Sequence, residues 1–425
     1  MSATALVVAN MIGVGVFTTS GFLLADLGSP HAVLLVWVLG GIIAMLGALS
    51  YGSLARHIPE SGGEYLFLSK TVHPAAGYMA GWISLLAGFS APLAMAAYGF
   101  GEYLQTWFPS VSRQITGTLL ILLFATVHST NVRWGAWFQN AVVLLKLALI
   151  ALFIALAFTR LPALANTPHT PVPVSVFGVS LMWVSFSYAG WNAAIYIGGE
   201  IRNPAKNLPR SLILGTGLVT LLYLGLNAAF VFSAPIDQLA GKLDIARIAS
   251  HALGGSAWSE ATSFLITLAL ATSASSLLMA GPRICARMAD DGWLPRFLRS
   301  TGAPPRSAIL FQATAAWLLL WTLTYDKLLT YISFTLGVST AATVAGLIFL
   351  KRREQTRLPV PGWPWVPYLF LAGVSTTTVL SIIQRPKESL IGLLTIFLPF
   401  LGWVCSRPRT PGSAGCRTDD SLDRS

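Results

Sequence analysis

Residues 12–21, IGVGVFTTSG, interrupt the first long apolar run of the chain with three glycines and a cluster of hydroxyl side chains. A second interruption, SFSYAGWN, occupies residues 185–192 of another apolar run. Glycine in a helix interior costs about 1 kcal/mol relative to alanine, although small residues also let membrane helices pack closely. Paired interruptions in corresponding positions of two halves of a membrane protein are typical of a transporter binding site.

The composition indicates a protein embedded in a membrane. Its 425 residues are 54% hydrophobic and 10% charged, with a mean hydropathy of +0.67, whereas a soluble domain carries about 25% charged residues. No cleavable signal peptide is evident, so we expect the first apolar segment to be retained as a span. The position of the natural start relative to Met1 stays open.

The apolar runs predict an all-α integral membrane protein with about twelve spans. The expected spans are 3–26, 32–55, 75–104, 115–130, 135–159, 176–199, 209–233, 258–285, 307–324, 328–350, 364–383 and 388–405. They form one membrane domain, 1–405, in which 1–160 and 176–350 would be two repeats and 363–405 two extra helices. The tail, 406–425, is rich in Pro, Gly, Ser and charge and is predicted to be a disordered cytoplasmic tail.

The basic residues set the expected orientation. If the N-terminus is cytoplasmic, most of the 27 lysines and arginines fall on the cytoplasmic side of the twelve spans. We therefore expect both termini in the cytoplasm of a cell membrane, with the compact loops favouring a bacterial inner membrane. The net charge of +11 lies in these loops, so no nucleic-acid partner is predicted. The three cysteines are far apart and predict neither a disulfide framework nor a metal site.

The two interruptions would suit a zwitterionic substrate. An unwound stretch at membrane depth is tolerated only where it lines a cavity or is buried in protein. The N-terminus of a half-helix favours a carboxylate, and exposed carbonyls together with a half-helix C-terminus favour an ammonium group. No acidic residue lies in the middle of either interrupted span. Backbone groups alone could therefore bind an amino acid.

Lys146 lies in the middle of an apolar run from Gly135 to Phe158. A lysine at the centre of a membrane helix costs roughly 2.5–3.5 kcal/mol and usually marks an ion or substrate path. Because burial disfavours the charged form of an ionisable group, we hypothesise that Lys146 couples a proton to transport. The alternative is a structural lysine that binds backbone carbonyls.

Four stretches resemble the amino acid–polyamine–organocation (APC) superfamily of permeases, and the likeness covers nearly the whole chain up to residue 405. They are MIGVGVFTTSGF (11–22), IPESGGEYLFLSKTVHPAAGYMAGW (58–82), FSYAGWNAAIYIGGEIRNPAKNLPR (186–210) and MAGPRICARMADDGWLPRFL (279–298). The resemblance implies a LeuT-type fold, with a 5+5 inverted repeat and discontinuous helices 1 and 6. It also implies amino acid transport driven by protons or by exchange.

The resemblance also assigns roles to residues. Near the substrate carboxylate it places Ile12, Gly13, Gly15 and Val16. Carbonyls for the amino group would come from Phe186, Ser187 and Ala189, and Trp191 or Phe186 would form part of a gate. Lys146 would occupy the place of a sodium ion in sodium-coupled relatives of the fold. The sequence has Val14 where the motif often has Ser or Thr, which removes a hydroxyl group.

Three further residues are candidates for supporting roles. Ser273 and Ser276 lie in the middle of span 258–285 and would contact the substrate or Lys146, or else pack between helices. Glu200 ends span 176–199 and would pair with a basic residue as a gate, or else remain a solvated charge. The histidines have no metal-ligand spacing, and the chain lacks the phosphate-binding and serine-hydrolase motifs.

These observations predict secondary active transport of amino acids and no enzyme activity, cofactor or metal. The expected partners are an amino acid, a proton as coupling ion and the lipid bilayer, and the expected unit is a monomer or loose homodimer. The absence of an intramembrane acid favours neutral over basic substrates. An exchanger, an exporter, or a transport-inactive sensor or subunit of the same fold remains the alternative.

Overall fold

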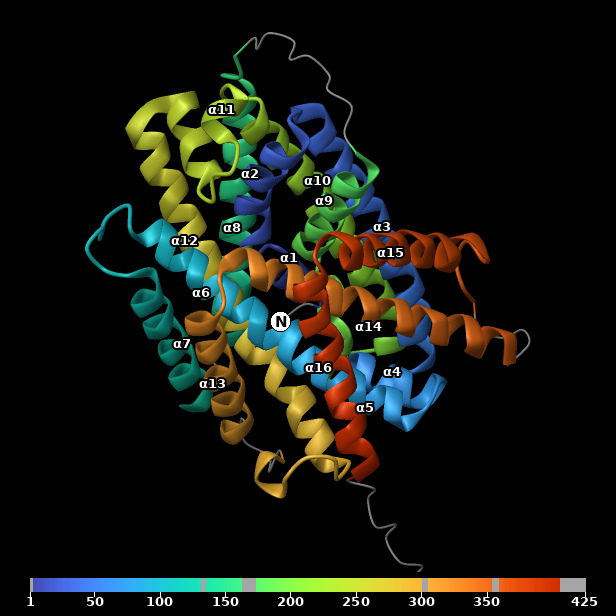
Figure 1. Ribbon diagram of the computed structural model, residues 1–425. Coiled ribbons are helices and arrows are strands. Elements are labelled where there is room, and N and C mark those ends of the chain that lie inside the picture. Colours follow the sequence, from blue (N-terminus) through green and yellow to red (C-terminus); the bar gives the residue numbers. More distant parts are fainter. Residues whose placement is uncertain (1–2, 131–134, 163–172, 300–304, 354–358, 406–425) are drawn as a thin grey trace, which may run out of the picture.

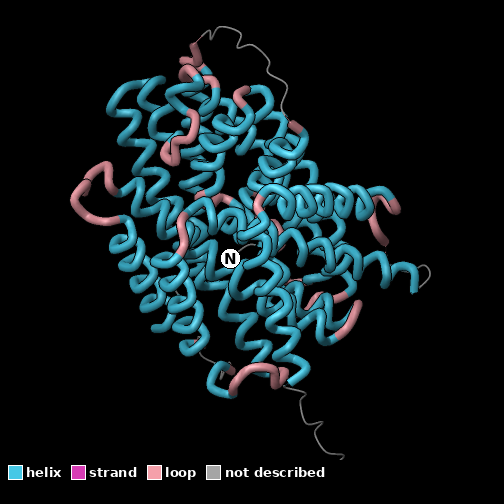
Figure 2. The backbone as a smooth tube through the Cα atoms, viewed as in Figure 1, coloured by secondary structure: helices cyan, strands magenta, loops and turns pink. Residues whose placement is uncertain are grey.

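Every regular element in the computed structural model is a helix within the residues that it describes, which are 3–130, 135–162, 173–299, 305–353 and 359–405 (Figure 1, Figure 2). The predicted tail lies outside these residues. The elements are α1 (Ala3–Met11), α2 (Gly15–Leu27), α3 (Pro30–His57), α4 (Gly63–Thr71), α5 (Pro74–Ile83), η1 (Ser84–Ser90), α6 (Ala91–Leu104), α7 (Arg113–Thr130), α8 (Gly135–Phe158), α9 (Val174–Ser187), η2 (Ala193–Glu200), α10 (Pro204–Val231), α11 (Ile236–Leu239), α12 (Ile245–Asp290), η3 (Arg296–Leu298), α13 (Arg306–Thr322), α14 (Tyr325–Arg353), α15 (Trp365–Gln384) and α16 (Pro386–Cys405).

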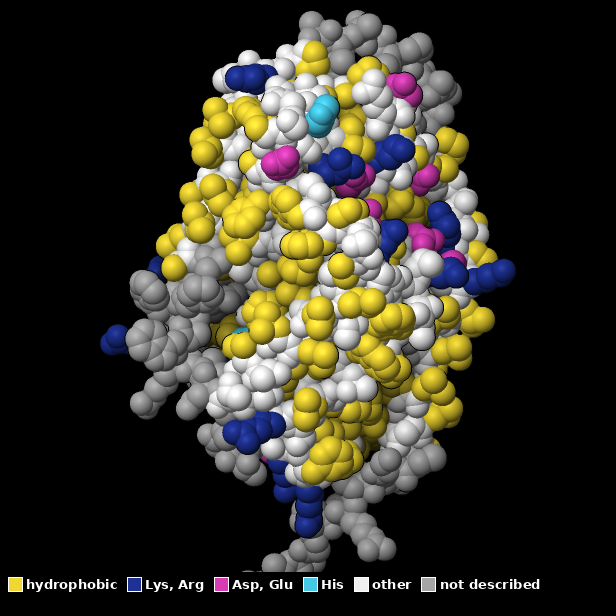
Figure 3. Space-filling model, turned by 90° about the vertical axis from the view of Figure 1, so that its left-hand side faces the viewer, with side chains coloured by type: hydrophobic (Ala, Val, Ile, Leu, Met, Phe, Trp, Pro, Cys, Tyr) yellow, Lys and Arg dark blue, Asp and Glu magenta, His cyan; other side chains and the backbone are white. Residues whose placement is uncertain are grey.

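Eight segments of the described chain are long and apolar enough to cross a membrane. They are Ala3–Leu27, Pro30–His57, Pro74–Leu104, Pro204–Val231, Ile245–Asp290, Tyr325–Arg353, Trp365–Gln384 and Pro386–Val404. Shorter apolar helices cover Val143–Phe158 and Val174–Ser187. Hydrophobic side chains spread over the face drawn in Figure 3, with charged side chains gathered mainly in its upper part and at its base. The prediction of an all-helical membrane protein is confirmed.

The first span is broken where its glycines cluster. Helix α1 ends at Met11 and α2 begins at Gly15. The amide of Ile12 still donates to the carbonyl of Val8, at 3.0 Å, but the amide of Gly13 turns back to the carbonyl of Met11, at 2.7 Å. The helical hydrogen-bond pattern therefore stops for three residues inside the span.

The second interruption also breaks its helix. Helix α9 ends at Ser187, and the chain turns through Gly190 before it continues as η2, a 3-10 helix. Gly190 has a φ of 100°, a conformation that side chains with a Cβ rarely adopt. The predicted span 176–199 is thus an α-helix followed by a turn and a tighter helix.

Two other predicted spans differ in detail from the structure. Span 75–104 contains a π-helical segment, η1, between α5 and α6. Span 258–285 is part of α12, a longer helix that begins at Ile245 and bends at Gly255, where φ is 75° and ψ is −163°. The predicted span begins after this glycine, whereas α12 continues on both sides of it.

The two broken segments lie against α3 and α10. Helix α10 packs along α3 and against α1, and α2 packs against α9. A buried polar group joins three of these helices: Trp37 of α3 donates to the hydroxyl of Ser20 on α2, which donates to Asn227 of α10, at 2.9 and 2.5 Å. Helix α11 lies at one end of the molecule, and α4 and α5 lie towards the other (Figure 1). We call these the α11 end and the α4 end.

Candidate substrate pocket

A pocket lies between the two helix breaks. The first break lines it with Gly13, Val14 and Gly15, and the second lines it with Phe186 to Ala193. The breaks also touch each other: a Cβ added to Gly15 would lie 2.5 Å from the hydroxyl of Ser187, and one added to Gly190 would lie 2.8 Å from the carbonyl of Asn10. Only glycine permits this approach at both positions, so the glycine clusters serve packing and pocket together.

The helix ends give the pocket two electrostatic poles. Helix α2 begins at Gly15, so the partial positive charge of its N-terminus lies at the pocket wall. Helices α1 and α9 end at Met11 and Ser187, so two C-termini with partial negative charge also face the pocket. A carboxylate and an ammonium group can thus be bound by backbone groups of neighbouring segments.

Tyr223 of α10 bridges the two breaks. Its hydroxyl lies 2.5 Å from the carbonyl oxygen of Met11 and 3.0 Å from that of Ser187. The side chain is fully buried. One hydroxyl therefore fixes the end of α1 relative to the end of α9. Tyr223 was not among the residues predicted from the sequence, and the signal available for it was a tyrosine inside the apolar span 209–233.

Lys146 reaches the first break from α8. Its Nζ donates to the carbonyl oxygen of Ile12 at 3.2 Å, and the side chain is completely buried. Within the described residues, no ion pair includes Lys146. The lysine does not line the pocket, but it binds a carbonyl next to Gly13, which does. A change in its charge would act directly on the backbone of the break.

The described residues that line the pocket carry no charged side chain. Its polar groups include Ser185, Ser187, Ser273, Ser333 and Asn192, whereas much of the remaining wall is apolar or aromatic. Phe89, which belongs to the π-helical segment η1, lines part of this wall. A substrate side chain in this pocket would meet apolar surface and hydroxyl groups.

Most of the predicted site residues lie together at this pocket. The lining residues among them are Gly13, Gly15, Phe186, Ser187, Ala189, Trp191 and Ser273. Ile12 is buried behind the wall and binds Lys146 through its carbonyl. Val16 is buried and does not line the pocket. Its place in α2 turns it toward the core, which the sequence motif did not reveal.

The two supporting candidates outside the pocket make other contacts. The hydroxyl of Ser276 donates to the carbonyl of Ser273 in the same helix, at 2.9 Å. Glu200, at the end of η2, pairs with Arg283 of α12 through two contacts of 2.7 and 3.1 Å. The pair is partly exposed and ties the second broken segment to α12.

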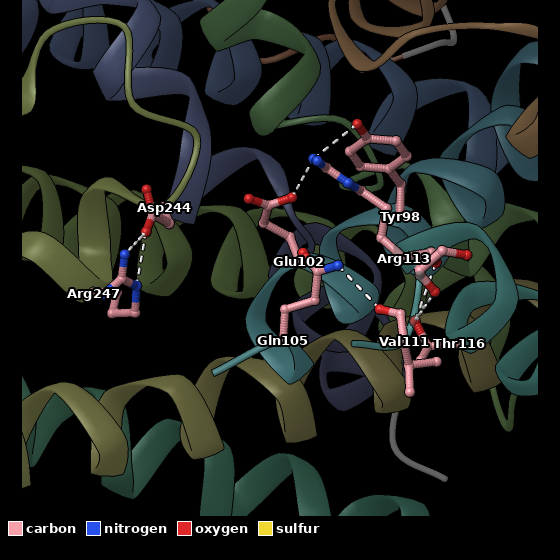
Figure 4. Close-up of polar contacts among 9 residues, drawn as sticks. Tyr98, Glu102, Gln105, Val111, Arg113, Thr116, Asp244 and Arg247 are labelled. Carbon is pink, nitrogen blue, oxygen red and sulfur yellow. Dashed lines mark hydrogen bonds and ion pairs between the residues drawn. The ribbon is translucent and has the colours of Figure 1, made fainter. Parts of the chain in front are cut away.

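A cluster of polar and aromatic side chains lies near the α11 end. Figure 4 shows the guanidinium of Arg113 between Tyr98 and Glu102, at 3.1 and 2.5 Å, and Asp244 beside Arg247 on the neighbouring segment. Tyr98 packs against Tyr325, whose hydroxyl lies 2.6 Å from that of Thr18 on α2. The contacts connect α6, α7 and α14 to the first broken segment.

No group of three or more His, Cys, Asp and Glu side chains that could hold a metal ion occurs in the part of the chain that the structure describes. The polar features at the pocket include its helix ends and its hydroxyl groups, and Lys146 binds the backbone behind its wall.

Comparison with known proteins gives the family. A family model described as amino acid permease matches residues 1–405. The Asc-type amino acid transporter 1 of Mus musculus is 28% identical over 418 residues, covering 93% of this chain and 78% of the relative. The large neutral amino acids transporter small subunit 2 of Homo sapiens is 28% identical over 415 residues (92% and 77%), and the b(0,+)-type amino acid transporter 1 of Mus musculus is 27% identical over 444 residues (96% and 90%). The chain therefore belongs to the amino acid permease family of the APC superfamily, whose members are membrane transporters and not enzymes.

Proposed function

We propose that this protein carries neutral amino acids across the cytoplasmic membrane by alternating access. The proposed architecture has twelve spans, with two inverted repeats over 1–160 and 176–350 and two extra helices over 363–405. The N-terminus and the C-terminal tail would face the cytoplasm. In this orientation the loops that carry most of the basic residues lie on the cytoplasmic side of the membrane. The α4 end of the molecule would then be cytoplasmic.

One observation supports neutral amino acids as the substrates. Two broken helices meet at a pocket that has no charged side chain among its described residues. Helix ends supply partial charges of both signs to a zwitterion. A cationic substrate side chain would lack a carboxylate partner there, and burying an unpaired charge is unfavourable. Relatives named as transporters of amino acids support the substrate class.

The proposed coupling ion is a proton, and Lys146 is its carrier. The ammonium group donates to the carbonyl of Ile12 inside the first break. Hydrogen bonds from a charged donor are roughly twice as strong as those between neutral groups, so loss of the proton would weaken the bond between α8 and the break. Gly13, the next residue, lines the pocket. A change in the bond between Lys146 and Ile12 would therefore shift backbone that contacts the substrate.

The test is uptake of a panel of radiolabelled amino acids into proteoliposomes, with and without an inward proton gradient. Gradient-dependent accumulation of neutral amino acids would support the proposal and identify the substrate. Uptake that requires only unlabelled amino acid inside the vesicle would indicate an exchanger and contradict proton coupling. Folded protein without uptake in either condition would favour a sensor or subunit.

A further inference from the structure

Glu64 is a buried carboxylic acid at the α4 end that the transport mechanism above does not use. It lies in the first turn of α4 and is 1% exposed. Three side chains bind its carboxylate oxygens. Tyr51 donates to Oε1 at 2.7 Å, Asn192 donates to the same oxygen at 3.0 Å, and the hydroxyl of Ser339 contacts Oε2. These donors come from α3, from the break between α9 and η2, and from α14.

The carboxyl group has no cationic partner among the residues that the structure describes. Within the described residues, none of the ion pairs includes Glu64. Within the described residues, the titratable groups that interact electrostatically with Glu64 are Tyr51 of α3 and Tyr196 of η2, and no charged side chain of α5 or α14 is among them. Burial raises the pKa of Glu64, and the three hydrogen bonds oppose this shift without cancelling it.

Glu64 lies directly behind the pocket wall. Asn192 and Tyr196 both line the pocket, and Trp191 packs edge-on against Tyr51 with ring centroids 4.6 Å apart. The start of α4 is pressed against η2, because a Cβ on Gly63 would lie 2.0 Å from the ring of Tyr196. Any motion that opens this end must therefore separate Glu64 from the second break.

We propose that Glu64 is a proton-binding site: it takes up a proton when α3, α4, α14 and the second break close over the pocket, and releases it to water when they separate. The inference rests on amino acid transport by this pocket and on a cytoplasmic α4 end. The hydroxyls of Ser339 and Tyr51 can rotate, so that they donate to the ionised carboxylate or accept from the protonated acid. Asn192 donates in both states.

The sign of the pH effect follows from the closed contacts. The closed state has the raised pKa, whereas water entering on opening restores the ordinary acidity of the carboxyl group. Closure is therefore favoured at low cytoplasmic pH, and this preference is lost as the pH rises through the closed-state pKa. Opening to the cytoplasm, and with it substrate efflux, should become faster as the internal pH rises.

The functional test compares Glu64→Gln with Glu60→Gln in right-side-out vesicles. Glu60 is a matched control, because it is an exposed acid near α4 that pairs with Lys70. Efflux of a radiolabelled neutral amino acid is measured over a series of internal pH values at fixed external pH. Between the ordinary pKa of a glutamate side chain and the raised closed-state pKa, Glu64 should contribute up to about tenfold per pH unit to the efflux of wild type and Glu60→Gln. Glu64→Gln should lose this contribution, because an amide does not titrate, and keep only the pH dependence that comes from Lys146. The same pH dependence in Glu64→Gln as in wild type would overturn the proposal.

A second measurement does not depend on transport. The infrared spectrum of purified wild type, minus that of Glu64→Gln and recorded over a series of pH values, should retain the C=O stretch of a protonated carboxylic acid at pH values above the ordinary pKa of a glutamate side chain. A difference spectrum without this band would overturn the proton site even if transport is normal. Conversely, absence of amino acid transport by wild type would contradict the proposed function and leave the infrared test standing. Glu64→Asp, which can still titrate, should retain a pH-dependent efflux if the glutamine variant does not fold.

Discussion

Two buried side chains, Lys146 and Tyr223, form hydrogen bonds with the backbone of the helix breaks. Lys146 donates to the carbonyl of Ile12, and Tyr223 lies within hydrogen-bonding distance of the carbonyls of Met11 and Ser187. Both bind main-chain oxygens that a continuous helix would have consumed. Because a buried carbonyl without a donor costs about 1–3 kcal/mol, each side chain stabilises an arrangement that the backbone alone would not keep.

Replacing Lys146 by methionine removes the charge and the donor while keeping a similar volume. We expect accumulation driven by a proton gradient to be abolished in Lys146→Met, because the carbonyl of Ile12 loses its proton-sensitive partner. The measurement is uptake into proteoliposomes with and without the gradient, alongside counterflow of labelled substrate. Gradient-driven accumulation equal to that of wild type would show that Lys146 is a structural lysine.

Replacing Tyr223 by phenylalanine removes only the bridging hydroxyl. The loss of a hydrogen bond to buried carbonyls should cost about 1–3 kcal/mol and raise the KM for substrate about tenfold or more, since the breaks on both sides of the pocket lose a shared donor. Tyr103→Phe is the matched control, because its buried hydroxyl donates to a single carbonyl, that of Phe17 in the first turn of α2, at 3.1 Å, and bridges no second break. Equal KM values in the two variants would refute the special role of Tyr223.

At the scale of elements, the pocket depends on two broken segments that fit closely together. Helix α2 begins against the end of α9, with the hydroxyls of Thr19 and Ser187 3.1 Å apart. The turn at Gly190 lies against the end of α1. Continuous helices would have consumed these backbone groups in their own hydrogen bonds, and no polar pole would face the pocket. The breaks therefore leave backbone groups of both helices available at the pocket.

Adding one methyl group at Gly15 should disturb this fit. In Gly15→Ala the new Cβ would lie 2.5 Å from the hydroxyl and 2.9 Å from the Cα of Ser187, so the two helices must move apart. We expect loss of most transport activity and a destabilisation of about 1–3 kcal/mol, measured by uptake and by thermal unfolding in detergent. Gly217→Ala is the control, since its Cβ would meet the methyl group of Met45 at 3.5 Å, an ordinary contact. Wild-type uptake in Gly15→Ala would contradict the close approach of α2 and α9.

At the scale of the whole molecule, the α11 end and the α4 end are each held by a set of side-chain contacts. The α11 end is held by Arg113 with Tyr98 and Glu102, and by the pair of Tyr325 with Thr18 (Figure 4). The α4 end is held by the contacts of Glu64 and by the Glu200–Arg283 pair. The alternating access that we propose would require these two sets to open in turn.

The proposed orientation predicts which end meets the outside of the cell. In a chain whose three cysteines are replaced by serine, a cysteine at exposed Gln238 of α11 should react with a membrane-impermeant maleimide added to intact cells. A cysteine at exposed Lys206, at the start of α10, should react only after the membrane is permeabilised. The opposite labelling pattern would reverse the orientation and place the α4 end outside.

The sequence alone determined the membrane class, the helical fold and the two breaks, and it pointed to seven of the residues that line the pocket. Apolar length and glycine placement act locally, because a membrane span must satisfy its backbone within itself and glycine loosens a helix where it stands. The four motifs also led to the correct family. These features require no knowledge of which helices are neighbours.

Only the tertiary structure decided which side chains reach the breaks. Tyr223 and Glu64 are distant in sequence from the segments they bind, by 212 residues for Tyr223 and Met11 and by 128 for Glu64 and Asn192. Periodicity gave no reason to single out either residue, and it could not show that Val16 turns away from the pocket while Ser273 faces it. Such contacts arise from how helices pack against one another, and one residue of rotation about a helix axis is enough to change a side chain's partner.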